Sequence, residues 1–308
     1  MALESQIVQL LFSGITVGSI YALIALGFVV IYNVTGIINF AQGEFAMIGA
    51  MITVTLSENT AIFNRVLKVS LNWPLPVAII ASVLIVSLLG VLLYNVAIRT
   101  AKGASVVSLI IITIGASIAL RGLALITWST DPFRLPNFTK GPPVEIAGAY
   151  LTLQNFWVVG ATGLILVALF LFFERTMVGK ALRACSINKL AARLMGIDIN
   201  RMAMFSFGLS AAIGAIGGIV ITPSTFMAYD SGELLGLKGF VAAIMGGMNS
   251  AVGAVIGGLT LGILESLGAG FLSSGYKDAI AFIMLFAILA ARLSGLLGQG
   301  AKQQESGL

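Results

Sequence analysis

The sequence contains no histidine and only one cysteine, Cys185, in 308 residues. Histidine is the commonest general base at neutral pH, and His and Cys together supply most zinc ligands. A histidine-based catalytic site, an imidazole proton relay and a zinc site of this kind are therefore excluded. A single cysteine also excludes a disulfide within the chain, so we expect Cys185 to be a reduced structural thiol.

Charged residues are scarce, and the motifs of nucleotide hydrolysis are missing. Asp, Glu, Lys and Arg make up 9% of the chain, whereas about 25% is usual for a soluble domain. Neither the phosphate-binding sequence GxxxxGK[ST] nor the dinucleotide-binding sequence GxGxxG occurs, because Lys180 is followed by Ala181 and lacks the earlier glycine. The sequence therefore predicts a protein that is not an enzyme and has no metal or cofactor of its own.

Long apolar runs are abundant instead. Hydrophobic residues make up 58% of the chain, and the mean hydropathy is +1.05. A helix needs about 20 apolar residues to cross ~30 Å of hydrocarbon, and the 36 glycines favour closely packed helices over a β-barrel. We therefore expect an all-α integral membrane protein, a polytopic bundle of about eight or nine transmembrane helices with broken or half-helices, forming a single domain over 1–308. The expected crossings are 7–32, 45–56, 75–98, 105–128, 156–173, 202–221, 253–270 and 278–291, with 239–247 as a half-helix.

A polar, glycine-broken segment, NVTGIINFAQGE at 33–44, separates the first two apolar runs. Non-helical backbone at membrane depth is tolerated only where protein or a water-filled cavity surrounds it. We expect this segment to interrupt a helix and, together with the half-helix 239–247, to line a passage, as discontinuous helices do in transporters. The candidates for the substrate pathway are Asn33, Asn39, Gln42 and Glu44. For Glu44 the alternative is a structural role at the helix N-terminus, where a carboxylate is stabilising.

The stretch 175–201 is the one strongly basic part of the chain, and its apolar residues repeat at helical spacing. Basic loops mark the cytoplasmic side of a membrane. This places the N-terminus outside and the C-terminus inside, and it places the long loop 129–154, with a hairpin-like sequence around Gly148, outside. We expect helices broken at Gly179 and Gly196 here. The positive charges could do no more than fix the membrane topology, but the apolar face favours contact with a partner protein.

Two further expectations concern charged residues elsewhere. Arg121 stands near the end of an apolar run, so we expect it to extend to the membrane interface, with a role in the passage as the alternative. Ser224 to Gly236 follows Pro223 and carries Asp230 and Glu233, which predicts an exposed turn.

Several segments together resemble the LivH-type permease subunit of branched-chain amino acid ABC importers: 18–50, 179–198, 238–265 and the terminal GLLG. The similarity covers nearly the whole chain in matching order. It implies the ABC importer permease fold in a bacterial inner membrane, with ATP and magnesium bound in partner subunits. The implied partners are a LivM-type permease, two cytoplasmic ATP-binding subunits and a periplasmic substrate-binding protein. It also implies ATPase coupling positions at Gly179, Lys180, Arg183, Ala184, Ala191, Arg193 and Gly196.

The chain departs from that family at Gln42, where histidine is common, near Asn188, where an acidic residue is usual, and at Arg99-Thr100 in place of Arg-Pro. These departures leave the permease class intact and the cargo open between a branched-chain amino acid, another small amino acid, urea and a carboxylate. A rival hypothesis is an ion-coupled secondary transporter that uses Glu44 and Glu265 as proton or sodium sites and needs no ATPase. A channel is disfavoured because no filter-like sequence is present.

Overall fold

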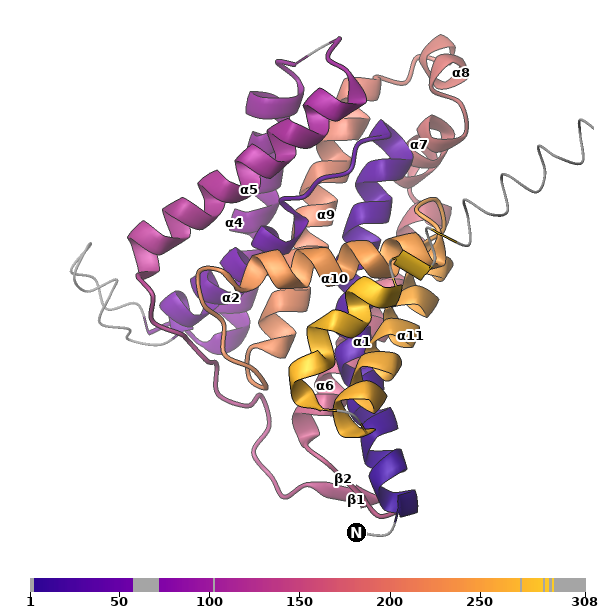
Figure 1. Cartoon of the computed structure of the whole chain (residues 1–308). Helices are drawn as coiled ribbons and strands as arrows, with labels where there is room; N and C mark the ends of the chain where they lie inside the picture. The colour runs from indigo at the N-terminus through magenta and orange to yellow at the C-terminus, as the bar shows by residue number, and fades with distance from the viewer. Residues whose placement is uncertain are drawn as a thin grey trace, which may run out of the picture.

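The computed structural model describes residues 3–57, 72–101, 103–271, 273–284, 286–287 and 290, and it shows a helical bundle with one small β-hairpin (Figure 1). Within these residues six helices are long and apolar enough to cross a membrane. They are α1 (Leu3–Thr35), α4 (Leu75–Leu93) with its π-helical extension η1 (Tyr94–Ile98), α5 (Val106–Trp128), α6 (Leu153–Arg175), α9 (Ile199–Ile221) and α11 (Ala251–Phe271).

The other described elements are shorter. They are α2 (Gln42–Ser57), α7 (Met177–Ile187), α8 (Lys189–Leu194), α10 (Ser231–Gly246), the 3-10 turn η2 (Ser274–Tyr276), and strands β1 (Val144–Ile146) and β2 (Ala149–Leu151). Residues 277–284 are also helical, and the rest of the predicted last crossing lies largely outside the described residues. The helical membrane class is confirmed, whereas six crossings by length and apolarity are fewer than the eight or nine expected.

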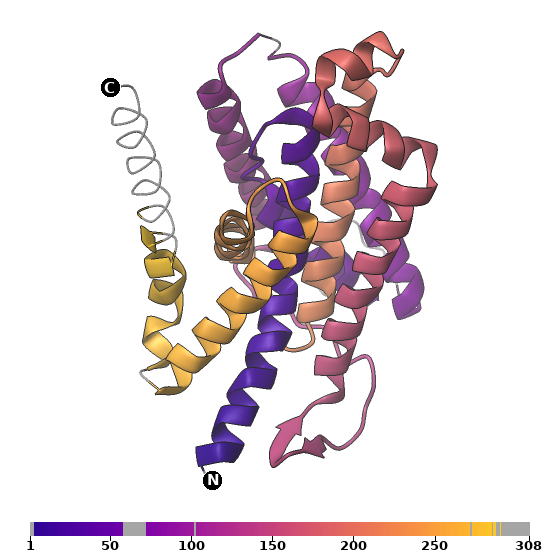
Figure 2. The ribbon, with the colours of Figure 1, turned by 90° about the vertical axis from the view of Figure 1, so that its right-hand side faces the viewer.

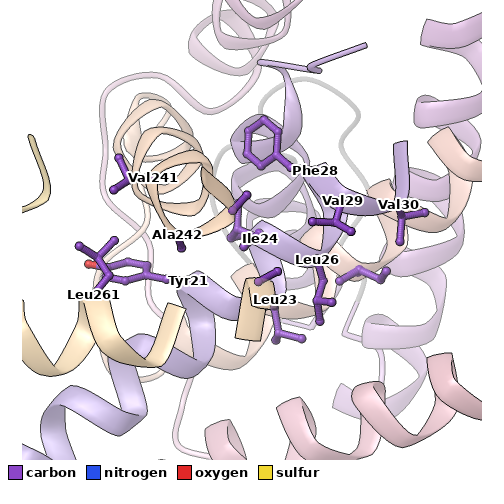
Figure 3. Packing of buried hydrophobic residues seen from close by; sticks show 14 of the residues in the cluster. Tyr21, Leu23, Ile24, Leu26, Phe28, Val29, Val30, Val241, Ala242 and Leu261 are labelled. Atoms are coloured by element: carbon purple, nitrogen blue, oxygen red, sulfur yellow. The ribbon is translucent and has the colours of Figure 1, made fainter. Parts of the chain in front are cut away.

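Helix α1 lies in the middle of the bundle, and α6, α9, α10 and α11 pack around it (Figure 2). From Gly18 to Ile31 every residue of α1 is buried, which is the behaviour of a helix that is apolar on all sides. Its side chains meet Val241 and Ala242 of α10 and Leu261 of α11 in the main core (Figure 3). In contrast, only 17% of the most apolar window of α5 is buried, against 83% for α1.

The contact between α1 and α11 depends on glycines that face one another. A Cβ atom on Gly18 would lie 2.8 Å from the carbonyl oxygen of Gly258, and one on Gly262 would overlap the backbone of Gly18. Gly14 likewise lies against the backbone of Ile263. Small residues at this spacing let two helix backbones approach closely, which agrees with the expectation that the many glycines favour closely packed helices.

Two peripheral features mark the opposite ends of the bundle (Figures 1 and 2). At one end β1 and β2 form the predicted hairpin, and its turn residues Ala147 and Gly148 both have positive φ. At the other end lie α7 and α8. Gly196 has a φ of +80° between α8 and α9, which confirms the predicted break there.

Two predictions on the chain path were wrong. Gly179 does not break a helix, because it lies inside α7 and packs directly on the carbonyl of Phe172 in α6. The supposed turn from Ser224 to Gly236 ends at Asp230, since α10 begins at Ser231 and is longer than the half-helix 239–247. The glycines of 231–236 serve close packing there, because Gly236 and Gly232 both lie against Gly43 of α2.

Candidate functional site

The predicted helix interruption is confirmed at residues 36–41, between the end of α1 at Thr35 and the start of α2 at Gln42. Gly36 has a φ of +76°, the left-handed conformation that commonly ends a helix at glycine. A side chain of α5 satisfies part of the opened backbone: Thr113 Oγ1 accepts from Phe40 N at 3.3 Å and lies 3.2 Å from Ile38 O. Protein therefore surrounds this non-helical backbone, as membrane depth requires.

Gln42 is fully buried and fills a space between α1 and α9. Its Nε2 donates to Ser210 O at 3.1 Å, and Ser210 Oγ lies 2.6 Å from its Oε1. The space exists because two glycines face it. A Cβ on Gly214 would come within 2.9 Å of Gln42 Nε2, and one on Gly27 would overlap the amide group. Gln42 therefore holds the start of α2 against two long helices.

Asn39 is also fully buried, and its Oδ1 accepts from Ala41 N at 3.2 Å. This local bond is typical of Asn just before a helix, where the side chain replaces a missing backbone partner. Its Nδ2 has no hydrogen-bond partner among the residues that the structure describes. Asn39 and Gln42 are thus both enclosed by protein.

Glu44 is the buried end of a network that joins α2, α5 and α10 and reaches the exposed Glu233. It is 1% exposed, and its Oε1 accepts from Ser117 Oγ at 2.9 Å and lies 3.4 Å from Arg121 Nη2. Arg121 Nη1 pairs in turn with Glu233 in the first turn of α10. Two carboxylates hold Arg121, the buried Glu44 and the exposed Glu233, and its extension to the membrane interface stays a prediction. A buried carboxylate needs such a partner.

Asn33 faces a cavity of about 630 Å³ between α1, α6, α7 and α11. Its Nδ2 donates to Asn249 O at 3.4 Å. Most of the wall is apolar, and the polar end is formed by Glu174 and Arg183, whose charged groups are 2.5 Å apart. Of the four predicted pathway residues, Asn33 faces this cavity, whereas Asn39, Gln42 and Glu44 are enclosed.

The basic segment packs one face on the bundle and leaves the other uncovered. Leu182 and Cys185 bury against Ile31, Val34 and Ile37, so α7 touches both the end of α1 and the start of the interruption. Five large apolar side chains point outward instead, each at least two-thirds exposed: Met177, Ile187, Leu190, Leu194 and Met195. Large apolar side chains left exposed in this way are typical of an interaction surface.

The predicted coupling positions also divide into buried and exposed residues. Gly179 is buried and Ala184 half-buried, whereas the remaining five are exposed: Lys180, Arg183, Ala191, Arg193 and Gly196. One contact was not foreseen: Lys189 Nζ donates to Thr35 O at 2.8 Å. This ammonium group binds the carbonyl at the C-terminal end of α1, where a cation is favoured.

The structure contains a second buried ion pair, and the sequence did not predict this pairing. Glu265 of α11 is 0% exposed, and Lys238 Nζ of α10 lies 2.7 Å from its Oε1. Lys238 also lies 2.7 Å from Asp278 Oδ1. The available signal was one Lys and one Glu within apolar runs, but the sequence did not show that they meet. Over the described ranges, no group of three or more His, Cys, Asp or Glu side chains is placed to hold a metal ion.

Comparison with known proteins gives one consistent result. Residues 10–289 match the family model described as branched-chain amino acid transport system, permease component. The chain is 33% identical to the high-affinity branched-chain amino acid transport system permease protein LivH of Salmonella typhimurium and to BraD of Pseudomonas aeruginosa, in each case over 94% of this chain and 95% of the relative. It is 24% identical to the ribose import permease protein RbsC of Haemophilus influenzae, over 90% and 83% respectively.

Proposed function

The chain belongs to the family of permease components of branched-chain amino acid transport systems, and from this premise we propose that it carries a branched-chain amino acid across the bacterial inner membrane. As the permease subunit of an ABC importer it is a transporter component and not an enzyme. The match over 10–289, on a bundle with six apolar helices of spanning length, is the observation that carries the proposal. Another small amino acid, urea or a carboxylate is the alternative cargo.

The energy comes from other subunits. The chain has no phosphate-binding motif, so ATP and magnesium bind in two cytoplasmic ATP-binding subunits. A LivM-type permease completes the membrane part, and a periplasmic substrate-binding protein delivers the cargo. The family and the uncovered apolar and basic surface of α7 and α8 support this assembly.

The segment 175–201 faces the cytoplasm in this proposal, because it carries the strongest positive charge of the chain. The loop 129–154, at the opposite end, is then periplasmic. The N-terminus is periplasmic as well, since Gln9 binds the backbone of Tyr150 in β2 through two hydrogen bonds. Adding α2 and the helix from residue 277 to the six long helices gives eight crossings, and counting α10 as well gives nine. This odd number places the C-terminus in the cytoplasm.

The substrate pathway runs beside the interruption at 36–41 and the half-crossing α10. Asn33 faces the adjoining cavity. Asn39, Gln42 and Glu44 are enclosed in the protein, where they hold in place the segments that form the wall of the pathway. Glu44 and Arg121 connect this wall to α10 through Glu233. A shift of α10 relative to α2 therefore changes the network on which the wall depends.

Coupling to the ATP-binding subunits passes through α7 and α8. Their exposed side carries Lys180, Arg183 and Arg193, and their buried side carries the contacts to α1 and the interruption. Closure of the ATP-binding subunits would move α7 and α8, and the Lys189–Thr35 bond would carry that movement to the end of α1. This arrangement would switch the passage between outward and inward access.

Reconstitution tests the function. The chain, its permease partner and the ATP-binding subunits are placed in proteoliposomes, and uptake of radiolabelled leucine is measured with the binding protein on the outer side. We expect uptake that requires ATP on the ATPase side and disappears when the catalytic glutamate of the ATPase is replaced. Accumulation by the chain alone under a sodium or proton gradient would instead establish the secondary transporter that uses Glu44 and Glu265.

A further inference from the structure

The ion pair between Arg121 of α5 and Glu233 of α10 is open on one side. The Arg121 side chain is 24% exposed, and that of Glu233 is 59% exposed. Beside the pair, a Cβ atom on Gly122 would point into open space among the described residues. Both charged groups can therefore be reached from outside the chain.

The position of the pair in the membrane determines what its open side faces. Arg121 lies seven residues before the end of α5 at Trp128, which is about 10 Å along the helix axis. Charged groups within spanning segments almost always face water or the bundle interior, because contact with lipid is costly. The open side of this pair therefore faces water, and ionisable residues in that setting mark substrate pathways.

The two helices that carry the pair also border the interruption. Phe40 N donates to Thr113 Oγ1 of α5, and the ring centroids of Phe40 and Phe240 of α10 are 5.2 Å apart. Thr113 precedes Arg121 by eight residues and Phe240 follows Glu233 by seven, so the pair lies about two turns from Phe40 along both helices. Figure 1 shows α5 and α10 on the same side of the bundle. In the proposed orientation, the pair is on the periplasmic side of the interruption.

Glu44 holds Arg121 from the buried side. Its Oε1 accepts from Ser117 Oγ at 2.9 Å and from Arg121 Nη2 at 3.4 Å. A Cβ atom on Gly232 would lie 2.3 Å from Glu44 Oε2, so the backbone of α10 covers that oxygen and keeps a ligand away from it. An exposed ion pair contributes little to stability, so Glu233 can be exchanged for another carboxylate while Glu44 keeps Arg121 in place.

We propose that Arg121 and Glu233 bind the two charged groups of a free α-amino acid at the outer end of the passage. The carboxylate of the ligand replaces Glu233 on the guanidinium, whose planar set of donors fits a carboxylate with two parallel hydrogen bonds. The released Glu233 then accepts from the ammonium of the ligand. The aliphatic part packs on Ile118 and Leu125, which are exposed and flank Arg121 at helical spacing.

This site selects among the alternative cargoes of the proposed function, on which the inference rests. A carboxylate without an ammonium would lie beside the displaced Glu233, and the two negative charges would repel each other. Urea has no charge for either Arg121 or Glu233. An amino acid adds no net charge and gives each of the two groups a partner, so it is the cargo that this pair favours.

The test measures binding to the complete complex of permeases and ATP-binding subunits, without the binding protein, in nanodiscs of phosphatidylcholine. Radiolabelled leucine is displaced by leucine, by leucinamide, which lacks the carboxylate, or by 4-methylpentanoate, which lacks the ammonium. We expect each analogue to bind at least about tenfold more weakly than leucine, because each loses one charge-assisted interaction. In a further arm the nanodiscs contain phosphatidylethanolamine, whose headgroup is also a zwitterion, and we expect leucine binding to be unchanged.

Variants of Glu233 assign the binding to this pair. Glu233→Gln should bind leucine at least about tenfold more weakly but 4-methylpentanoate no more weakly than the wild type, because no displaced carboxylate then repels it. A purely structural role of Glu233 would not remove the preference for leucine in this way. Glu233→Asp keeps the charge and should retain the preference. Asp230→Asn is the matched control, since Asp230 is also exposed at the start of α10 and its side chain makes no capping hydrogen bond.

Four results would overturn the proposal: no saturable leucine binding to the wild type, equal binding of 4-methylpentanoate and leucine, displacement of leucine by phosphatidylethanolamine, or unchanged preference in Glu233→Gln. Loss of the co-purifying permease partner in Glu233→Gln would also overturn it, because Glu233 would then be a contact between subunits. ATP-driven leucine uptake by the wild type in proteoliposomes is measured separately. Uptake without this site would leave the proposed function standing, whereas absence of ATP-driven uptake would contradict the function itself.

Discussion

At the scale of single residues, the fully buried amide of Gln42 is possible only because Gly27 and Gly214 have no side chain. Gly27→Ala would place a methyl group on that amide and should destabilise the protein by about 1–3 kcal/mol, the usual cost of overpacking. The melting temperature of the purified protein measures this. Gly115→Ala is the matched control, because nothing lies within 4 Å of a Cβ there and alanine favours the helix. Equal melting temperatures for the two variants would contradict the packing role.

The Glu44 network supports a second prediction at this scale. Glu44→Gln removes the charge that holds Arg121 and Ser117, so it should cost about 1.5–3 kcal/mol of stability, as charge-assisted hydrogen bonds do. Arg121→Gln alone should also destabilise, and the double variant should lose less than the sum of the two. Thermal unfolding of the three variants gives the coupling. Strict additivity would mean that the pair contributes nothing.

Cys185 gives a prediction on pH. Burial raises the pKa of its thiol above the usual value, and nearby Lys189 opposes this in part. A raised pKa leaves less thiolate at a given pH, so the rate of maleimide labelling should begin to rise at a higher pH than for an exposed cysteine. Ser186→Cys in a Cys185→Ser background provides that exposed reference on the same helix. Labelling of both thiols with the same pH profile would contradict the buried placement.

At the scale of elements, the role of the hydrogen bond between α8 and α1 can be tested separately from the role of the surface on which the ATP-binding subunits dock. Lys189→Met keeps most of the length of the side chain but removes the donor to Thr35 O. We expect the ATP-binding subunits to remain attached and to hydrolyse ATP, while leucine uptake per ATP falls several-fold. Lys140→Met in the opposite loop is the control, and Lys189→Arg should restore part of the uptake. Unchanged uptake per ATP in Lys189→Met would exclude this route of coupling.

The elements also show what the sequence could reveal and what it could not. The interruption at 36–41 was predictable because polar residues stand where lipid would otherwise surround them. The start of α10 was missed because Asp230 and Glu233 indicated an exposed turn, whereas Gly232 and Gly236 bring α10 against Gly43 of α2. Local composition cannot show this packing, since it depends on a neighbour about 190 residues away.

The ion pairs could not be predicted from the sequence for the same physical reason. Arg121 and Glu44 were each identified, but their pairing across α2 and α5 depends on how the helices pack. Lys238 and Glu265 meet only because α10 turns back on α11. The roles of the Asn39 and Gln42 side chains could not be derived from the sequence, because the same polar residues could face water or join two helices. Which of the two applies depends on the residues that pack around them.

At the scale of the whole molecule, the uncovered face of α7 and α8 should decide assembly. Arg183→Glu reverses a charge on this face and also breaks the pair with Glu174. We expect the variant to insert normally, to lose most co-purifying ATP-binding subunit and to lose ATP-driven uptake. Lys140→Glu, at the other end of the bundle, should assemble normally. Intact assembly and full uptake in Arg183→Glu would show that the subunits dock elsewhere.

The enclosure of α1 has a consequence for biosynthesis. This helix leaves the ribosome before the other described helices, and three of its packing partners, α9, α10 and α11, are synthesised more than 160 residues later. Until the last third of the chain is synthesised, the apolar surface of α1 must therefore remain in contact with lipid or with the insertion machinery. A nascent chain that stops after α6 therefore leaves the central helix without α9, α10 and α11.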